Sequence, residues 1–248
     1  MIDIHCHILP GLDDGARSPE EGLVMAKMAV KDGIHTLIAT PHTLNGVYLN
    51  SADKVGRDVK RFQAELSRRG IPLKCLPGSD IHLCPGLNRR IKDGDAATMN
   101  NKGKHILLEF PPQIIPERIK DEIFSLKLGG ITPIITHPER HPLIGRHPEF
   151  LFELVSMGAL CQITAMSITG DFGEPARYAA ERMLEGRMVH IIATDAHSSD
   201  TRPPLLSSAV EAAADILCSY EEAERMVTEV PAAIISGKNV DIDKPRKG

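Results

Sequence analysis

Short apolar runs alternate with longer amphipathic segments along the whole chain. Seven runs have the length and apolar character of buried strands, at 1–7, 35–42, 73–82, 105–110, 131–137, 159–165 and 189–197. The segments between and after them follow a helical pattern, at 19–32, 53–69, 116–128, 148–157, 175–185, 203–217 and 220–230. Proline near the first turn of several segments and glycine just past their ends support the helix assignments. The strands recur about every 30 residues, which is typical of βα units with a parallel sheet.

Repeated βα units are compatible with a closed (β/α) barrel or with an open doubly wound sheet. No linker or low-complexity stretch interrupts the pattern, so we expect one α/β domain over 1–248. In both architectures, functional residues gather at the carboxyl ends of the strands. The number of metal-ligand side chains at those ends favours the barrel.

Residue types that bind metals end six of the seven predicted strands, in a chain with 11 histidines. The strand ends and the loop after the first strand carry His5, His7, Asp14, His42, Asp80, Glu109, His137, Asp195 and His197. Because side chains alternate along a strand, His5 and His7 share one face, and so do Asp195 and His197. If these faces line the barrel, its carboxylates would repel one another without cations. We therefore expect a site with several metal ions.

The ligand types indicate which ions fit this site. Nitrogen and oxygen donors without thiolate suit Mn²⁺, Fe or Zn²⁺ rather than a structural zinc centre. Cys6 lies between two ligands, so it points to the opposite face and is expected in the core. The other histidines lie at strand starts or in loops, and we expect structural roles for His35, His82, His105, His141, His147 and His190.

Composition and charge exclude several classes of protein. The chain has 42% hydrophobic and 25% charged residues, which is typical of a globular protein. Its 29 Lys and Arg balance 33 Asp and Glu, and only 4% of residues are aromatic, so a nucleic-acid partner is not indicated. Five widely spaced cysteines contain no C-x-x-C pair, and neither a signal peptide nor a membrane-spanning run is evident. We expect a cytoplasmic protein that does not insert into membranes; its oligomeric state is left open.

The same residues resemble a known family. Segment 1–16, MIDIHCHILPGLDDGA, is similar to the opening of the polymerase-and-histidinol-phosphatase (PHP) superfamily. More narrowly, it resembles the bacterial manganese-dependent protein tyrosine phosphatases encoded with capsule and exopolysaccharide genes. Supporting motifs follow in order: ATPH (39–42), PGSD (77–80), LLE (107–109), ITHPER (135–140), QITA (162–165), SITG (167–170) with Phe172, and DAH (195–197). The resemblance implies a distorted seven-stranded (β/α) barrel of the PHP type.

The resemblance also implies three divalent metal ions, with Mn²⁺ preferred. The expected ligand sets are His5, His7 and Asp195 for the first ion, Glu109 and His137 for the second, and Asp14, His42 and His197 for the third. A bridging carboxylate would join the first two ions, and Asp80 and Glu109 are both candidates. Arg140 and Arg202 match positions that grip the phosphate, and a guanidinium suits a phosphate dianion because it donates two parallel hydrogen bonds.

Three positions depart from the family pattern. Asp80 stands where the family usually has Glu, which shortens a bridging side chain by one methylene. Thr43 stands where a second His is usual, which removes a group for substrate binding or proton transfer. Thr194 replaces a common Ser.

The implied activity is metal-dependent hydrolysis of phosphotyrosine in proteins. The implied partner is the phosphorylated tail of a bacterial tyrosine autokinase that regulates capsule and exopolysaccharide synthesis. Close cations lower the pKa of water and polarise phosphoryl oxygens. The phenolate of tyrosine, with a pKa near 10, is a good leaving group. We expect an open barrel mouth without a deep specificity pocket.

Other functions remain as alternatives. The nearest is hydrolysis of histidinol phosphate or another small phosphoester with the same metals. A metal-dependent exonuclease lacks a basic surface, and a metal-storing or scaffold protein would hydrolyse no phosphoester. Cys84 and Arg90 match the C-x5-R spacing of cysteine-based tyrosine phosphatases, but the intervening loop contains one Gly and one Pro without an amide hydrogen.

Overall fold

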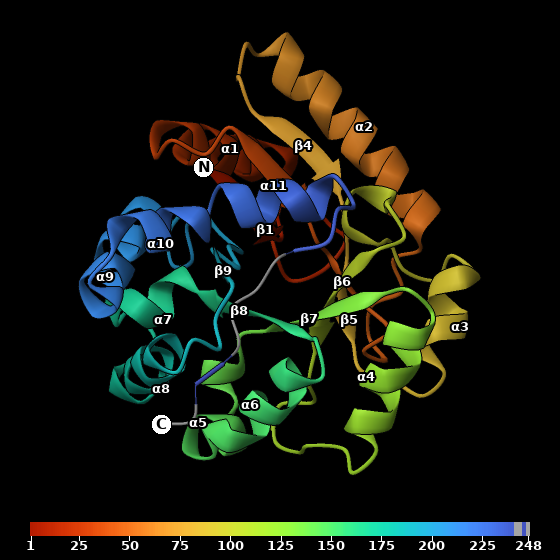
Figure 1. Ribbon diagram of the computed structural model, residues 1–248. Helices are drawn as coiled ribbons and strands as arrows, with labels where there is room; N and C mark the ends of the chain where they lie inside the picture. Colours follow the sequence, from red (N-terminus) through yellow and green to blue (C-terminus); the bar gives the residue numbers. More distant parts are fainter. Residues whose placement is uncertain (241–244, 247–248) are drawn as a thin grey trace.

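Nine strands, all pairing in parallel, form two sheets in the computed structural model, which describes residues 1–240 and 245–246 (Figure 1). The strands are β1 (Ile2–Cys6), β2 (Thr36–Ala39), β3 (His42–Thr43), β4 (Lys74–Pro77), β5 (Asp80–His82), β6 (His105–Glu109), β7 (Thr132–Thr136), β8 (Leu160–Thr164) and β9 (Ile191–Ala193). One sheet has the order β1-β2-β4, and the other has the order β3-β5-β6-β7-β8-β9. Every predicted strand run contains at least one of these strands.

Two of the predicted strands are each divided in two, so the expected count of seven is not confirmed. Run 35–42 breaks at Thr40 and Pro41, and proline donates no ladder hydrogen bond. Run 73–82 breaks at Gly78, which passes very close to β2. A Cβ atom at Gly78 would lie 2.7 Å from the side chain of Ile38, so only glycine fits there. Each divided segment therefore contributes one strand to each sheet.

The sheets meet where the chain after β9 returns to β1. The amide of Asp195 donates to the carbonyl of His5 at 2.8 Å, and the amide of His7 donates to the carbonyl of Ala196, also at 2.8 Å. Cys6 and Ala196 form an isolated parallel bridge. These bonds bring the end of the last strand segment beside the end of the first.

Helices follow most strands and surround the sheets (Figure 1). They are α1 (Pro19–Lys31), α2 (Ala52–Arg68), α3 (Leu87–Lys92), α4 (Ile119–Leu128), α5 (Pro142–Arg146), α6 (Pro148–Ser156), α7 (Ala165–Thr169), α8 (Glu174–Glu185), α9 (Ser207–Leu217), α10 (Tyr220–Arg225) and α11 (Glu229–Ile235), with 3₁₀ turns η1 (Met99–Asn101) and η2 (Pro138–Arg140). Serine caps begin α1 and α2, where the hydroxyls of Ser18 and Ser51 accept amide hydrogen bonds. The predicted helix at 220–230 is divided because Thr228 leaves the helical conformation. None of the described helices is long and apolar enough to cross a membrane.

Two apolar layers lie on opposite faces of the strands, and the smaller one forms the floor of the site. The larger packs between the strands and the outer helices and includes Leu37, Ile106 and Ile135. The smaller lies on the other face and is built from Ile38, Leu107, Ile134, Leu160, Ile191 and their neighbours, with Ile234 of α11 against it. Glu109, Thr136 and Gln162 each lie two positions after one of these apolar residues, on the same face of the same strand. The same face therefore changes from apolar to polar towards the carboxyl ends of the strands.

Candidate metal centre

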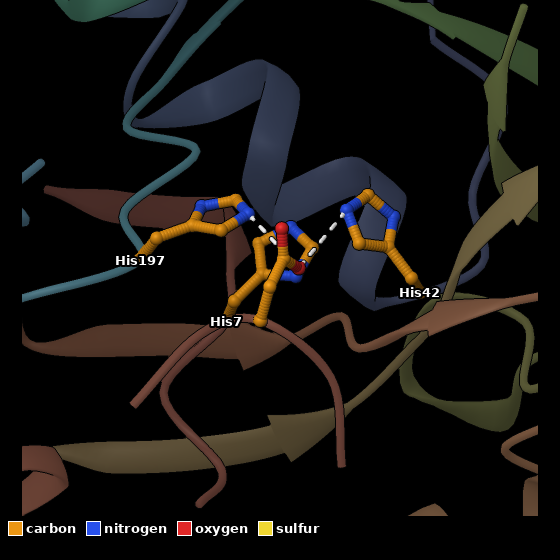
Figure 2. A group of neighbouring side chains, drawn as sticks. His7, His42 and His197 are labelled. Carbon is orange, nitrogen blue, oxygen red and sulfur yellow. Dashed lines mark ion pairs between the residues drawn. The ribbon is translucent and has the colours of Figure 1, made fainter. Parts of the chain in front are cut away.

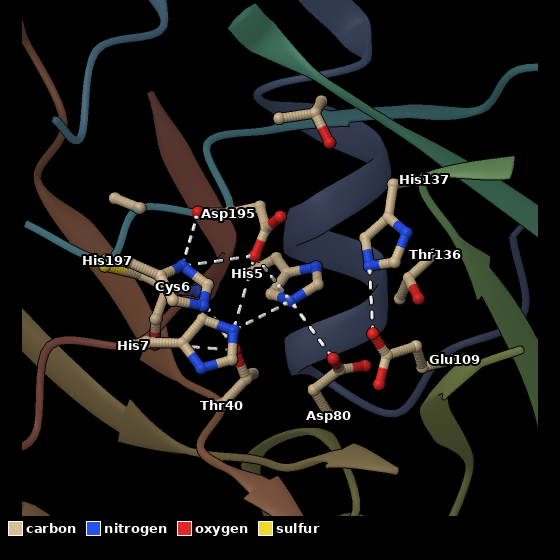
Figure 3. A network of polar contacts seen from close by, with 12 residues as sticks. His5, Cys6, His7, Thr40, Asp80, Glu109, Thr136, His137, Asp195 and His197 are labelled. Carbon is tan, nitrogen blue, oxygen red and sulfur yellow. Dashed lines mark hydrogen bonds and ion pairs between the residues drawn. The ribbon is translucent and has the colours of Figure 1, made fainter. Parts of the chain in front are cut away.

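The first expected ligand set meets at the end of β1. His5 Nε2 and His7 Nε2 lie 3.2 Å apart, and each lies 3.3 Å from Asp195 Oδ1 (Figure 3). The two histidines share a face, as the alternation of side chains predicted. Cys6 between them is fully buried in the larger apolar layer, which confirms its expected packing role. A histidine pair and one carboxylate thus converge on one point.

The second group lies beside the first and contains the expected third set. Asp14 Oδ1 lies 3.6 Å from His42 Nε2 and 3.7 Å from His197 Nε2, and the ring of His7 lies between those of His42 and His197 (Figure 2). The ring centroid of His7 is 4.4 Å from that of His42 and 3.9 Å from that of His197. Each of the four residues offers a ligand atom, and these atoms lie within 4.8 Å of one another.

The third group follows the ends of β5, β6 and β7. Glu109 Oε1 lies 3.7 Å from His137 Nε2, and Glu109 Oε2 lies 3.6 Å from His42 Nδ1. The structure adds His82, whose Nδ1 is 3.6 Å from Glu109 Oε2, although the sequence analysis assigned this residue a structural role. Asp80 lies between the groups, since its Oδ2 is 3.0 Å from His42 Nδ1 and 3.6 Å from His5 Nε2. All nine predicted ligands therefore occupy one connected cluster.

The residues of this cluster fit divalent cations. Asp80 is completely buried, yet neither of its carboxylate oxygens receives a hydrogen bond from any described residue. Burying a carboxylate is costly unless a positive charge lies beside it, and that charge can come from a protonated His42 or from a metal ion. The Nε2 atoms of His5 and His7 face each other at 3.2 Å, and two lone pairs at that distance repel unless a positive charge lies near them. The nitrogen and oxygen donors are those that Mn²⁺, Fe and Zn²⁺ accept.

Hydrogen bonds donated by Nδ1 hold three of the histidines with Nε2 facing the cluster. The Nδ1 of His5 donates to Gln162 Oε1 at 2.9 Å, and the Nδ1 of His7 donates to Asp13 Oδ2 at 2.6 Å. The Nδ1 of His197 donates to the carbonyl of Asp195 at 2.9 Å. Such bonds fix the ring and tautomer of a metal-binding histidine. Sequence reasoning did not assign these roles to Asp13 and Gln162, although Asp13 adjoins a predicted ligand and Gln162 is the one amide in an apolar strand.

The charges of the cluster favour ionised carboxylates. Burial opposes the charge of Asp195, but His5, His7 and Arg202 outweigh it and hold its pKa well below the usual range. Burial also opposes the charge of His42, yet Asp80 and Glu109 raise its pKa to about 10. The acidic groups therefore attract positive charge strongly, whether it comes from protons or from metal ions.

Two predicted ligands adopt a backbone conformation that is unfavourable for residues other than glycine. His137 has a φ of 35° and Asp195 a φ of 50°, and both directly follow a strand or its extension. Such left-handed conformations cost free energy and persist only where surrounding contacts hold them. Here the turn directs each side chain from the strand end into the cluster.

Both predicted phosphate-binding arginines reach the cluster at Asp195. Arg140 Nη1 donates to Asp195 Oδ2 at 2.6 Å, and Arg202 Nη2 donates to the same oxygen at 2.5 Å. Their guanidinium carbons lie 4.5 Å and 5.7 Å from the ring centroid of Phe172. The aromatic ring thus lies under both cations, a role that the sequence analysis did not assign to Phe172. A small cavity of about 200 Å³ is lined by Arg140 together with Glu109 and His137.

The structure explains two departures from the family pattern. Thr43 is buried, and its hydroxyl accepts a hydrogen bond from the amide of Asn50, so it holds the following loop. Thr194 donates from its hydroxyl to the buried Asp3 at 2.5 Å, which links β9 to β1 beneath the cluster. A serine hydroxyl has the same donor, so this replacement preserves the bond.

Cys84 lacks the environment of a catalytic thiolate. Burial raises the pKa of its thiol, and the neighbouring Arg90 does not reverse this effect. Catalytic cysteines have a lowered pKa because the thiolate is the nucleophile. The C-x5-R match is therefore not supported.

Comparisons with known proteins agree with this geometry. The family model for capsular polysaccharide synthesis, CpsB/CapC, matches residues 1–236. The tyrosine-protein phosphatase YwqE of Bacillus subtilis (strain 168) is 40% identical over 202 residues, which cover 82% of this chain and 79% of that protein. The putative tyrosine-protein phosphatase CapC of Staphylococcus aureus is 35% identical over 206 residues, which cover 83% of this chain and 80% of that protein.

A solved structure has the same fold over almost its full length. It comes from the crystal structures of YwqE from Bacillus subtilis and CpsB from Streptococcus pneumoniae, described as metal-dependent tyrosine phosphatases. It superposes with a TM-score of 0.94 at 35% identity and covers 99% of this chain and 98% of that chain. Because the family model spans nearly the whole sequence and the relatives align over most of it, this chain belongs to the CpsB/CapC family of capsular polysaccharide synthesis.

Proposed function

We propose that this protein is a metal-dependent phosphatase that hydrolyses phosphotyrosine in proteins. The observation that carries the proposal is the convergence of all nine predicted ligands with two arginines at one cluster. Membership of the CpsB/CapC family supports the same activity, since the related YwqE and CpsB are tyrosine-protein phosphatases.

The proposal includes three divalent ions, with Mn²⁺ preferred and Fe or Zn²⁺ as alternatives. His5, His7 and Asp195 would hold the first ion, Glu109 and His137 the second, and Asp14, His42 and His197 the third. Asp80 and Glu109 are both candidates for the bridging carboxylate, because Asp80 Oδ2 lies 3.6 Å from His5 of the first set and Glu109 Oε1 lies 3.7 Å from His137 of the second. When bound, the ions would supply Lewis acidity, which polarises phosphoryl oxygens and activates water.

The protein's own residues would bind and orient the phosphate. Arg140 and Arg202 both contact one oxygen of Asp195, which places their guanidinium groups beside the cluster. A phosphate dianion would accept hydrogen bonds from these groups, which stabilise the charge that spreads over its oxygens during transfer. Gln162 and Asp13 would keep His5 and His7 in the tautomer that presents Nε2. The phenolate of tyrosine leaves without a strong general acid.

The biological assignment follows from the family. We propose that the substrate is the phosphorylated tail of a bacterial tyrosine autokinase that regulates capsule or exopolysaccharide synthesis. A cytoplasmic location fits the five free cysteines.

We further propose one domain over 1–248 and treat the two sheets as one distorted barrel. The hydrogen bonds between the segment after β9 and β1 support this view, because they join the first and last strand segments.

The test uses purified protein stripped of metal with a chelator and reloaded with Mn²⁺, Fe²⁺ or Zn²⁺. We expect the reloaded protein to hydrolyse a phosphotyrosine peptide faster than a phosphoserine peptide or histidinol phosphate. His5→Ala, His137→Ala and Asp195→Asn should each lower metal content and activity by orders of magnitude, whereas Cys161→Ser should be close to the parent. Preference for histidinol phosphate would support the alternative substrate, and no phosphoester hydrolysis in the reloaded protein would refute the proposal.

A further inference from the structure

A second hollow lies beside the phosphate-binding arginines and has no part in the proposed chemistry. Its volume is about 630 Å³, which is within the range of ligand-binding pockets. Its lining residues come mainly from η2, α5 and α8, which pack against one another. Arg140 lines both this hollow and the smaller cavity over Glu109 and His137. A peptide whose phosphotyrosine reaches the cluster would therefore place an adjoining residue here.

The hollow carries excess positive charge. It is lined by Arg140, Arg146 and Arg182, whereas Glu139 is the one acidic residue in its described lining. Glu139 is buried, and its Oε1 accepts hydrogen bonds from the amide of Thr164 and the hydroxyl of Ser167. Its carboxylate is therefore directed into the protein rather than towards the arginines.

Two of these arginines are available to an outside carboxylate. In the described part of the chain, neither Arg146 nor Arg182 has a carboxylate oxygen within 4.0 Å. Other surface arginines do form ion pairs with a nearby Asp or Glu, for example Arg17, Arg118 and Arg177. Glu149 and Glu185 share a neighbouring hollow with Arg182 but form no ion pair with it among the described residues. The guanidinium of Arg182 lies 5.8 Å from the ring of Tyr178, which is 61% exposed.

We propose that this hollow binds an acidic residue next to the phosphotyrosine of the substrate, through Arg146 and Arg182. The inference rests on the proposed function and extends it to the choice of substrate. Guanidinium groups pair with carboxylates through two parallel hydrogen bonds, and the exposed Tyr178 offers an apolar surface to the peptide backbone. The sequence alone predicts no deep specificity pocket, because residues of η2, α5 and α8 meet only in the folded chain.

The experiment compares two phosphotyrosine peptides that differ only in the flanking residues, glutamate on both sides in one and lysine in the other. The Mn²⁺-loaded parent should show about tenfold higher kcat/KM for the glutamate peptide, since two partly exposed ion pairs each contribute a modest preference. Combining Arg146→Gln with Arg182→Gln should reduce this ratio to about twofold, and Arg182→Glu should favour the lysine peptide. A partly misfolded preparation lowers both rates equally, so the ratio reports only on recognition.

Arg177→Gln is the matched control, because Arg177 lies on the same helix and pairs with Glu181 away from the hollow. It should keep the parent's ratio. A parent ratio near one, or an unchanged ratio in the double variant, would overturn the inference. Phenyl phosphate has no flanking residues and separates the two proposals. If the parent hydrolyses it but does not distinguish the peptides, the proposed function stands and the acidic subsite fails. If the parent hydrolyses none of the three, the proposed function fails and the subsite with it.

Discussion

Phe172→Leu tests whether the aromatic ring holds the two arginines in place for the phosphate. The substitution keeps an apolar side chain at the position but removes the π face under Arg140 and Arg202. At 4.5 Å, Arg140 is well within the range of a cation–π interaction, and we assign it about 1 kcal/mol. At 5.7 Å, Arg202 is near the outer limit, and we assign it about 0.5 kcal/mol.

The sum of about 1.5 kcal/mol corresponds to about a tenfold loss of kcat/KM if both interactions are needed to position the arginines. The assay measures kcat/KM on phenyl phosphate, inhibition by inorganic phosphate and metal content. We expect slower turnover and weaker phosphate inhibition, with the metal content of the parent. Phe172→Tyr keeps the ring and should stay within about twofold of the parent.

The combination of Phe172→Leu with Arg140→Lys gives a second check. If the ring acts through Arg140, removing the ring should cost less once the guanidinium is absent. Parent-like activity of Phe172→Leu would refute the reasoning. A loss of metal from this variant would also refute it, because the ring would then support the ligands rather than the arginines.

Three further predictions address other parts of the structure. Gln162→Leu removes the acceptor for His5 Nδ1 and should lower metal affinity about 10- to 100-fold, measured by competition with a chelator; unchanged affinity would exclude the orienting role. Arg202→Lys keeps the charge but loses the paired hydrogen bonds, so activity on two unrelated phosphotyrosine peptides should fall equally while metal content is retained; a loss on one peptide alone would indicate sequence reading instead. Burial lowers the pKa of His190 to about 4 in the folded protein, against 6.5 when unfolded, so the unfolded state takes up its proton first as the pH falls. The free energy of unfolding should therefore drop by about 3 kcal/mol between pH 6.5 and pH 4 from this group, and denaturant titrations of His190→Gln should lack that part of the decrease.

Much of the fold could be predicted because its signals are local. The apolar runs fall on the strands, and proline and glycine fall at helix ends, since backbone conformation depends on neighbouring residues. The division of run 73–82 could not be predicted from hydrophobicity. It depends on the close approach of Gly78 to Ile38, which are distant in the sequence.

The cluster could also be predicted in its main parts, because the carboxyl ends of parallel strands meet at one end of the fold. That rule brought His5, Glu109 and Asp195 together without any knowledge of distances. The rule could not identify the residues that orient a candidate ligand or an arginine without contacting the metal or the phosphate themselves. Gln162 and Phe172 have side chains common in cores and loops, and only their contacts with His5 and with the arginines indicate a role.

The sequence by itself determined the βα repeat and the candidate ligands at or near strand ends, because these follow from the pattern of side chains along one segment. His42 and Asp80 are exceptions, since they begin the short strands β3 and β5. The tertiary structure alone decided which atoms face each other. The burial of Asp80 between His5 and His42 results from the approach of β1, in one sheet, to β3 and β5 in the other. The hollow with Arg146 and Arg182 likewise forms only when α8 packs against η2 and α5, since the electrostatic field at a point sums over all nearby charges regardless of their position in the chain.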